Sequence, residues 1–288
     1  MVKVIEILHD LNFILTGNNE GEIVIWKMPN MIQHTNIGNN NIAITSFCYL
    51  NDGVSFYCGD ANGRLSKLLI NDLAAKTNFD KKLNGPLEGL TTGYDSTYIY
   101  SFCNTNVNVW NILTNSHVFD IEAHTEKISN ILYLREQRML VSVGTDKLLH
   151  FWDPIAPSKE RLKKSFKDHT SAILHLDYCG IGGKQALFSI SDNREICFWS
   201  IDSDLNKITF LKKNILEDIP INVVYCQNNK HLILVVEQGF YVYEYESLSV
   251  SDLFQAEENE ISICKYFGDG STLLCYSKNN NIDFWECD

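Results

Sequence analysis

The segment TDKLLHFWD, residues 145–153, ends a pattern that returns along the whole chain. In each copy, turn residues are followed by a short apolar strand and then by tryptophan or an aromatic or aliphatic substitute. These ladder residues are Trp26, Leu68, Trp110, Trp152, Trp199, Tyr243 and Trp285, at steps of 42, 42, 42, 47, 44 and 42 residues. All five tryptophans occupy the ladder, and a regular spacing of about 40–45 residues indicates a structural repeat.

Each repeat predicts four short antiparallel strands. The segment before a ladder residue is rich in β-branched and aromatic residues, as in 107–110, which favours a strand. Turn formers such as Asn62-Gly63 and Asp146-Lys147 precede it. In the fourth repeat, further apolar runs lie at 128–134, 140–143 and 162–166. One such sheet cannot bury both faces alone, so we expect seven sheets to pack radially into a closed ring.

The fourth repeat carries a specific motif, because His124, Ser142, Asp146, Trp152 and Asp153 have the spacing of a WD repeat. The chain resembles WD-repeat β-propellers. The resemblance implies one all-β domain over residues 1–288, a seven-bladed β-propeller of four-stranded antiparallel blades. In that family, such histidine, serine, aspartate and tryptophan side chains form a hydrogen-bond network between strands. The fifth repeat has a second set, with asparagine replacing the aspartate, at His169, Ser189, Asn193 and Trp199.

The two ends of the chain align unequally with the repeat. Val2 aligns with Ile128 and Trp26 with Trp152, so we expect the chain to begin on the innermost strand of the first blade. Only three residues follow Trp285, so we expect the last blade to lack its outer strand. Three explanations are open. The last blade has only three strands, the sequence is part of a longer protein, or a partner donates a strand to the edge at 281–285.

Composition excludes several classes of function. The formal net charge of −12 argues against nucleic-acid binding, which depends on clustered lysine and arginine. The sequence has no apolar run of membrane-spanning length and no leader, so we expect an intracellular protein, cytoplasmic or nuclear. Nine cysteines occur without a C-x-x-C pair, which favours buried reduced thiols over metal or redox chemistry.

One basic cluster departs from the acidic average, near the predicted outer strand of the fourth repeat. Its members are Lys159, Arg161, Lys163, Lys164 and Lys167. Lysines on an outer strand often serve to discourage edge pairing. The alternative is a patch for an acidic partner or a phosphoinositide.

No motif points to catalysis, because the sequence lacks a G-x-S-x-G elbow, an H-E-x-x-H pair and a phosphate-binding loop. We therefore expect no enzyme, cofactor or metal, but a scaffold or adaptor subunit that binds protein partners. The resemblance implies contacts at the rim where turns meet the channel, at Asn19, Ala61, Lys127, Thr145, Asp192, Glu260 and Lys278. The alternative is a peptide or modified-residue reader, or substrate receptor, that uses the channel mouth.

Overall fold

The computed structural model describes residues 2–28, 30–38, 41–50, 52–93, 96–181, 184–201, 208–226, 231–236, 239–244, 250–255, 261–267, 272–277 and 282–286. These residues form 27 β-strands and two short 3-10 helices, η1 (His9–Leu11) and η2 (Ser158–Glu160). Among them, no helix has the length and apolarity needed to span a bilayer. The chain divides into two compact units, residues 1–144 with 149–165, and residues 145–148 with 166–288.

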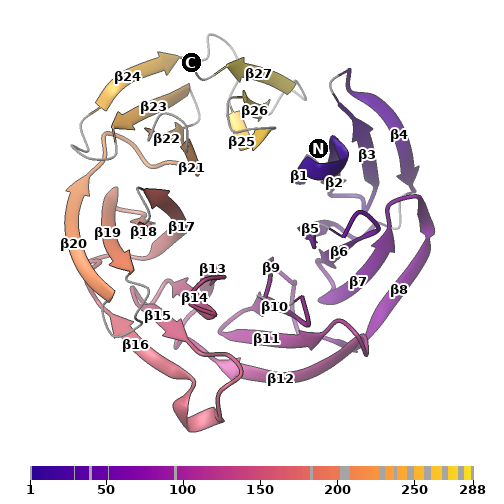
Figure 1. Cartoon of the computed structure of the whole chain (residues 1–288), viewed down its shortest axis with the longest axis horizontal. Helices are drawn as coiled ribbons and strands as arrows, with labels where there is room; N and C mark the ends of the chain where they lie inside the picture. The colour runs from indigo at the N-terminus through magenta and orange to yellow at the C-terminus, as the bar shows by residue number, and fades with distance from the viewer. Residues whose placement is uncertain are drawn as a thin grey trace. The chain divides into compact units, whose positions relative to one another are not determined.

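The first unit holds four antiparallel sheets, and each is a meander of four consecutive strands (Figure 1). One residue of these strands, the last of β16, is assigned to the second unit. In chain order the strands are β1 (Val2–Leu8), β2 (Phe13–Asn18), β3 (Ile23–Lys27) and β4 (Ile32–Ile37); β5 (Ile44–Tyr49), β6 (Ser55–Asp60), β7 (Arg64–Leu69) and β8 (Asp72–Lys82); β9 (Gly89–Thr92), β10 (Tyr98–Cys103), β11 (Asn106–Asn111) and β12 (Ser116–Glu122); and β13 (Ile128–Leu134), β14 (Met139–Gly144), β15 (Leu149–Trp152) and β16 (Leu162–Phe166).

The second unit holds two further four-stranded meanders and one sheet with three strands within the described residues. Its strands are β17 (Ile173–Ile181), β18 (Lys184–Ser191), β19 (Glu195–Ile201) and β20 (Ile208–Ile215); β21 (Asn222–Cys226), β22 (His231–Val236), β23 (Gly239–Glu244) and β24 (Val250–Gln255); and β25 (Ile261–Phe267), β26 (Thr272–Ser277) and β27 (Ile282–Glu286). Four-stranded antiparallel sheets of the propeller type are therefore confirmed: the described residues form six sheets of four strands and one of three.

Every ladder residue lies on the third strand of its sheet, from Trp26 on β3 to Trp285 on β27. Trp110 and Trp199 are fully buried. Beside five ladder residues the pairing between the third and fourth strands shifts register, as at Val109 and Trp110. Such a bulge bends the strand and increases its twist locally.

Neighbouring sheets of the first unit pack face to face through apolar side chains. Phe79 on β8 meets Trp110 on β11 edge to face, with ring centroids 5.7 Å apart. Tyr100 on β10 stacks on Tyr133 on β13 at 5.4 Å. These rings belong to continuous buried clusters that join successive sheets. Each sheet therefore buries the face that it could not bury alone.

Six cysteines on the strands are buried and free: Cys48, Cys58, Cys103, Cys197, Cys264 and Cys275. The expectation of buried reduced thiols is confirmed for these six. Burial raises the pKa of Cys58 and of Cys197 to about 12. Thiols whose pKa lies so far above neutral pH are poor nucleophiles, because the thiolate is the reactive form.

Candidate functional site

Ser142 on β14 is the centre of the polar network in the fourth sheet. Its Oγ lies 2.7 Å from Nε2 of His124 and accepts a hydrogen bond from Nε1 of Trp152 at 2.9 Å. His124 precedes β13, and its backbone N–H donates to the carbonyl of Thr105 at 3.1 Å. Ser142 is fully buried. The network thus connects β14, β15 and the loop before β13, and it has no surface open to a ligand.

The same contact between an indole and a hydroxyl recurs in the first and third sheets. Nε1 of Trp26 donates to Oγ1 of Thr16 at 2.9 Å. Nε1 of Trp110 donates to Oγ of Ser101 at 2.8 Å. The sequence analysis did not single out Ser101, which lies nine residues before its tryptophan, whereas Thr16 and Ser142 lie ten before theirs. The signal that could have found it is a hydroxyl on the second strand, with one residue fewer in the hairpin.

The fifth sheet uses its predicted residues differently. Nε2 of His169 lies 2.6 Å from Oγ of Ser189. Among the described residues, however, Nε1 of the buried Trp199 has no hydrogen-bond partner. The side chain of Asn193 bonds instead to Ser191 at 2.6 Å and to Thr170 at 2.8 Å. The asparagine therefore stabilises the turn before β19 and the loop before β17.

A buried ion pair that the sequence analysis missed lies beside His169. Oε1 of Glu195 is 2.6 Å from Nζ of Lys213, and its side chain is only 9% exposed. The backbone N–H and the hydroxyl of Thr170 donate to the same carboxylate at 2.9 and 2.7 Å. Burial opposes ionisation, but the hydrogen bonds from Lys213 and Thr170 outweigh it and lower the pKa of Glu195 to about 2. Burial lowers the pKa of His169 to about 4, against the opposing charge of Glu195.

Ser189, His169 and Glu195 follow the order of a hydrolytic triad, with Oε2 of Glu195 3.8 Å from Nδ1 of His169. A nucleophile must reach its substrate, however. Ser189 is 0% exposed and His169 is 4% exposed. This arrangement therefore stabilises the sheet and offers no site for a substrate.

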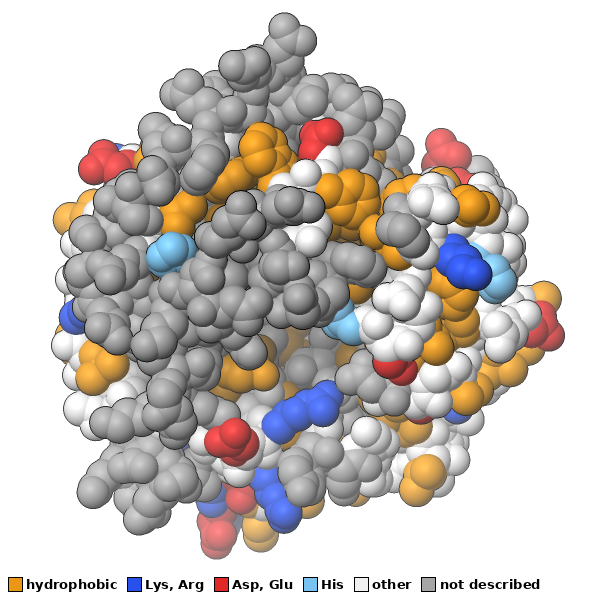
Figure 2. Space-filling view, turned by 45° about the horizontal axis from the view of Figure 1, so that its top comes forward, with side chains coloured by type: hydrophobic (Ala, Val, Ile, Leu, Met, Phe, Trp, Pro, Cys, Tyr) orange, Lys and Arg blue, Asp and Glu red, His pale blue; other side chains and the backbone are white. Residues whose placement is uncertain are grey.

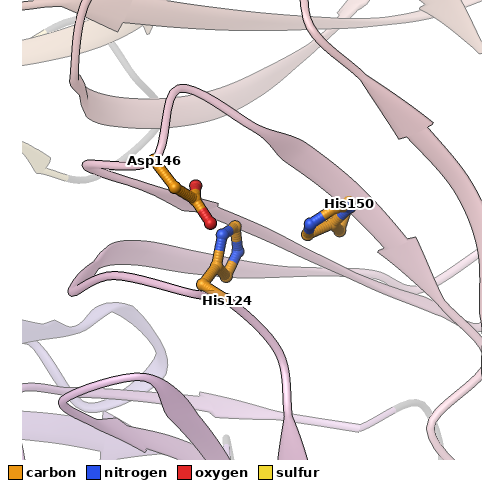
Figure 3. A group of neighbouring side chains, drawn as sticks. All are labelled: His124, Asp146 and His150. Carbon is orange, nitrogen blue, oxygen red and sulfur yellow. The ribbon is translucent and has the colours of Figure 1, made fainter.

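One group of potential metal ligands lies in the described part of the chain: His124, Asp146 in the turn after β14, and His150 on β15. Their ligand atoms all lie within 4.8 Å of one another. Figure 3 shows the carboxylate of Asp146 turned toward the ring of His124, with His150 farther along. Nε2 of His124 is already in contact with Ser142. Oδ1 of Asp146 accepts a hydrogen bond from the N–H of Leu148 at 3.2 Å, and the ring of His150 contacts that of Trp152 with centroids 5.5 Å apart, so all three side chains also have partners within the sheet.

The predicted partner residues occupy turns and loops. Asn19, Ala61 and Asp192 are exposed in the turns between second and third strands, and Thr145 is half-buried in an equivalent turn. Lys127 is exposed just before β13 and forms an ion pair with Glu88 at 2.8 Å. The remaining two, Glu260 and Lys278, lie outside the described residues. On the face drawn in Figure 2, described acidic and basic side chains are dispersed and do not form one patch.

The basic cluster is partly engaged by the protein itself. The guanidinium of Arg161 lies 3.8 Å from the ring centroid of Phe119, and its Nε donates to the carbonyl of Ala156 at 3.0 Å. Lys163 pairs with Asp153 at 3.7 Å. Lys159 and Lys167 are exposed and Lys164 is half-buried. Arg161 therefore contributes packing as well as charge, as cations over aromatic rings do.

Comparison with known proteins identifies the fold. No family model matches the chain. The crystal structure of the WD40 β-propeller domain of Doa1 superposes on all of the chain and 93% of that domain, with a TM-score of 0.78 and 13% sequence identity. The chain has a WD-repeat β-propeller fold.

Relatives of this propeller found by sequence include proteins that contain WD repeats. Human WD repeat-containing protein 36 is 24% identical over 216 residues, 71% of the chain and 24% of that protein. The anaphase-promoting complex subunit cdc20 of Dictyostelium discoideum is 22% identical over 203 residues, 65% of the chain and 38% of that protein. Cilia- and flagella-associated protein 337 B of Tetrahymena thermophila is 31% identical over 127 residues, 40% of the chain and 9% of that protein. The matches therefore span well under half of each relative.

Removing the central hydroxyl of the propeller's fourth sheet tests the network. We expect Ser142→Ala to lower the free energy of unfolding by about 1–3 kcal/mol, because it leaves the indole of Trp152 and the ring of His124 buried without their shared partner. Urea unfolding measures the change. The exposed Ser165→Ala is the matched control, with an expected change within about 0.5 kcal/mol. Equal effects of both substitutions would contradict the assigned role.

Proposed function

We propose that this chain is a non-catalytic scaffold or adaptor subunit that binds protein partners through its exposed turns. One observation carries the proposal. The recurring polar residues of the WD pattern are buried and bonded to one another, as in Ser142 with His124 and Trp152, while the turns next to them are exposed. A rigid framework with variable exposed turns is suited to recognition, because loops held by a scaffold carry binding functions.

The organisation that we propose is a single domain over residues 1–288, with the seven sheets as the seven blades of a closed ring. The seven ladder positions at near-equal spacing support it, as do the sheets that bear them. We also propose an intracellular location, cytoplasmic or nuclear. The buried free thiols support that location, because secreted proteins tend to oxidise their cysteines in pairs.

The relatives support a role in assemblies, although fold alone does not assign function. One of them is by name a subunit of the anaphase-promoting complex. The others are a protein named for its WD repeats and a protein associated with cilia and flagella. Their names share no single substrate, which agrees with a framework whose partners are chosen by its surface residues.

The partner surface is tested by Lys127→Ala, Asp192→Ala and Lys278→Ala combined in one variant. We expect this triple variant, purified by affinity tag from its native cells, to lose at least about tenfold of the partner recovered by the unmodified chain, a loss of about 1.4 kcal/mol in binding. A control with the same charge changes combines Lys27→Ala, Lys76→Ala and Glu136→Ala, all at exposed positions. Equal recovery by the triple variant and the unmodified chain would contradict this surface.

Two alternatives have their own outcomes in that experiment. A varied set of weakly held proteins, in place of one stoichiometric partner, would favour a peptide reader or substrate receptor. Within the described residues, β27 pairs only with β26 and carries an exposed aromatic side chain, Phe284. A partner lost through Phe284→Asp but kept by the triple variant would favour strand donation at this edge, since an open edge accepts an added strand.

A further inference from the structure

The first unit contains a pocket at one end of the second sheet. It lies where the turn from β6 to β7 meets the loop from β8 to β9, and its volume is about 340 Å³. Six residues line it: Ala61, Asn62, Lys82, Leu83, Asn84 and Gly85. This volume is at the lower end of the range for small-ligand sites, about 300–1,000 Å³. The pocket can therefore hold one side chain or a small anion.

Backbone hydrogen bonds fix the shape of the pocket. The N–H of Leu83 donates to the carbonyl of Gly63 at 2.9 Å, and the N–H of Leu87 donates to that of Asp60 at 3.1 Å. Gly63 has a φ of +77°, and a Cβ there would lie 2.4 Å from the carbonyl oxygen of Gly85. The turn and the loop thus approach each other as closely as a glycine permits. A pocket held by main-chain bonds is formed before a ligand arrives.

Two cations face each other at the edge of this pocket. Arg64 on β7 and Lys82 on β8 are direct partners in the strand register. Both side chains are exposed, and neither forms a salt bridge within the described residues. Directly opposed like charges on a sheet repel each other. An anion placed between or beside them would relieve that repulsion.

The carboxylate of Asp60 does not neutralise both cations. Asp60 is buried, and its Oδ1 already accepts hydrogen bonds from the backbone N–H groups of Asn62 at 2.9 Å and Arg64 at 3.0 Å. It contributes one negative charge against two positive charges. Glu88, at the end of the loop from β8 to β9, is paired with Lys127. A net positive charge therefore remains at the edge of the pocket.

The polar groups that line the pocket are also suited to a ligand that accepts hydrogen bonds. Asn62 and Asn84 present side-chain amides for which the described residues provide no hydrogen-bond partner, since the recorded bond at Asn84 uses its backbone carbonyl. An amide NH₂ group and an ammonium group are donors. Phosphate and carboxylate groups are acceptors that bind most strongly to charged donors. Ala61 and Leu83 add apolar wall beside these donors.

We propose that this pocket binds an oxyanion, a phosphate or carboxylate group on a peptide segment of a partner protein, with Lys82 and Arg64 supplying the charge and the two asparagines supplying hydrogen bonds. The inference deepens the proposed function, because Ala61 belongs to both the pocket and the predicted partner surface. The inference depends on the proposed function only in assigning the peptide to a partner protein. Binding of the oxyanion itself can be measured without any partner.

The test is isothermal titration of the intact chain with inorganic phosphate and with three short peptides that differ only in a central phosphoserine, glutamate or serine. We expect the phosphoserine peptide to bind more tightly than the serine peptide, and Lys82→Gln to weaken it at least about tenfold. Lys76→Gln removes the same charge from the same strand, six residues or about 20 Å away, and should leave binding unchanged. Binding of the glutamate peptide at equal strength would identify a carboxylate as the natural group.

Two results would overturn the proposal. One is that neither phosphate nor any charged peptide binds better than the serine peptide. The other is that Lys76→Gln weakens binding as much as Lys82→Gln, because the effect would then be one of overall charge. The thermal midpoint of Lys82→Gln without anion provides a check on folding. We expect no decrease, since the substitution removes repulsion with Arg64, and a large decrease would contradict the proposed opposition of charges.

This experiment separates the pocket from the partner surface. Intact phosphate binding by a double variant, Asp192→Ala with Lys278→Ala, which keeps the ion pair of Lys127 with Glu88, together with loss of its partner, would support both proposals. Loss of phosphopeptide binding in Arg64→Gln, in a variant that keeps its thermal midpoint, would support the pocket even if no stable partner is recovered. If the chain recovers a partner but binds no oxyanion, the proposal of an oxyanion pocket is contradicted and that of the partner surface is not.

Discussion

Replacing Trp110 by alanine is expected to lower the free energy of unfolding by about 3–5 kcal/mol, the usual cost of removing a buried tryptophan. The side chain is 0% exposed and packs edge to face against Phe79 of the preceding sheet, at 5.7 Å, and against His117 at 5.2 Å. Its N–H also donates to Ser101 at 2.8 Å. The truncation therefore opens a cavity between two sheets and leaves Ser101 without its donor. Chemical unfolding followed by circular dichroism measures the loss.

Two variants separate the parts of this effect. Trp110→Phe keeps most of the apolar volume and removes the N–H, so we expect it to cost about 1–3 kcal/mol. Leu113→Ala, in the turn between β11 and β12, removes a side chain that is 80% exposed, and we expect a change within about 0.5 kcal/mol. If Trp110→Ala cost no more than Leu113→Ala, the ladder residue would not be the wedge between these sheets.

Replacing Lys213 by methionine is the second substitution with a large expected effect. It leaves the carboxylate of Glu195 without its cation, in a site where that side chain is only 9% exposed. Breaking a buried pair costs about 3–5 kcal/mol. The side chain of Lys213 is 30% exposed, so solvent screens the pair and we expect about 2–4 kcal/mol. Thermal and urea unfolding measure the change, with the exposed Lys167→Met as the matched control.

A double variant isolates the interaction between the two charges. Glu195→Gln keeps an acceptor for Thr170 and removes the charge, so Lys213→Met should cost much less in that background. A coupling energy of at least about 1 kcal/mol between the two positions is expected for side chains in one network. Additive effects would show that Lys213 acts through its packing and not through its charge.

The same cluster predicts how stability depends on pH. The pKa of Glu195 is lowered from 4.5 to about 2, so its contribution of about 3 kcal/mol is present above pH 4.5 and is lost as the pH falls toward 2. The pKa of His169 is lowered from 6.5 to about 4, so the unfolded chain takes up its proton first and stability falls between pH 6.5 and 4. Both groups therefore make the protein less stable as the pH falls. We expect Glu195→Gln to flatten the profile below pH 4.5, as measured by unfolding at several pH values.

Much of the architecture could be predicted because it depends on local pattern. A strand of β-branched residues that ends in an aromatic residue has few other ways to bury its faces. The third-strand position of all seven ladder residues follows from that pattern. The contact of His124 and Trp152 with Ser142 was implied by the resemblance of this repeat to a WD repeat, and the structure shows both contacts.

Residues whose role depends on a distant strand could not be found in this way. Lys213 belongs to a run of basic residues on an outer strand, which resembles an ordinary solvated face until β19 and β20 pair and bring it to Glu195. Arg161 belonged to a basic cluster interpreted either as charges that discourage edge pairing or as a patch for an acidic partner, yet it lies on the ring of Phe119 from another sheet. The sequence does not show which group a charged side chain will contact, because that depends on how the strands pair and pack.

The sequence by itself determined the repeat, the strand order within each sheet and the buried aromatic ladder, because these depend on period and side-chain size over a few residues. Only the tertiary structure decided which polar groups pair and which remain open to a ligand. Arg64 and Lys82 are 18 residues apart in the chain and become direct neighbours through the register of β7 and β8, beside a bulge between Arg64 and Ser66. A shift of one residue in that register would turn one of the two side chains to the other face of the sheet and separate the pair of charges on which the oxyanion pocket depends.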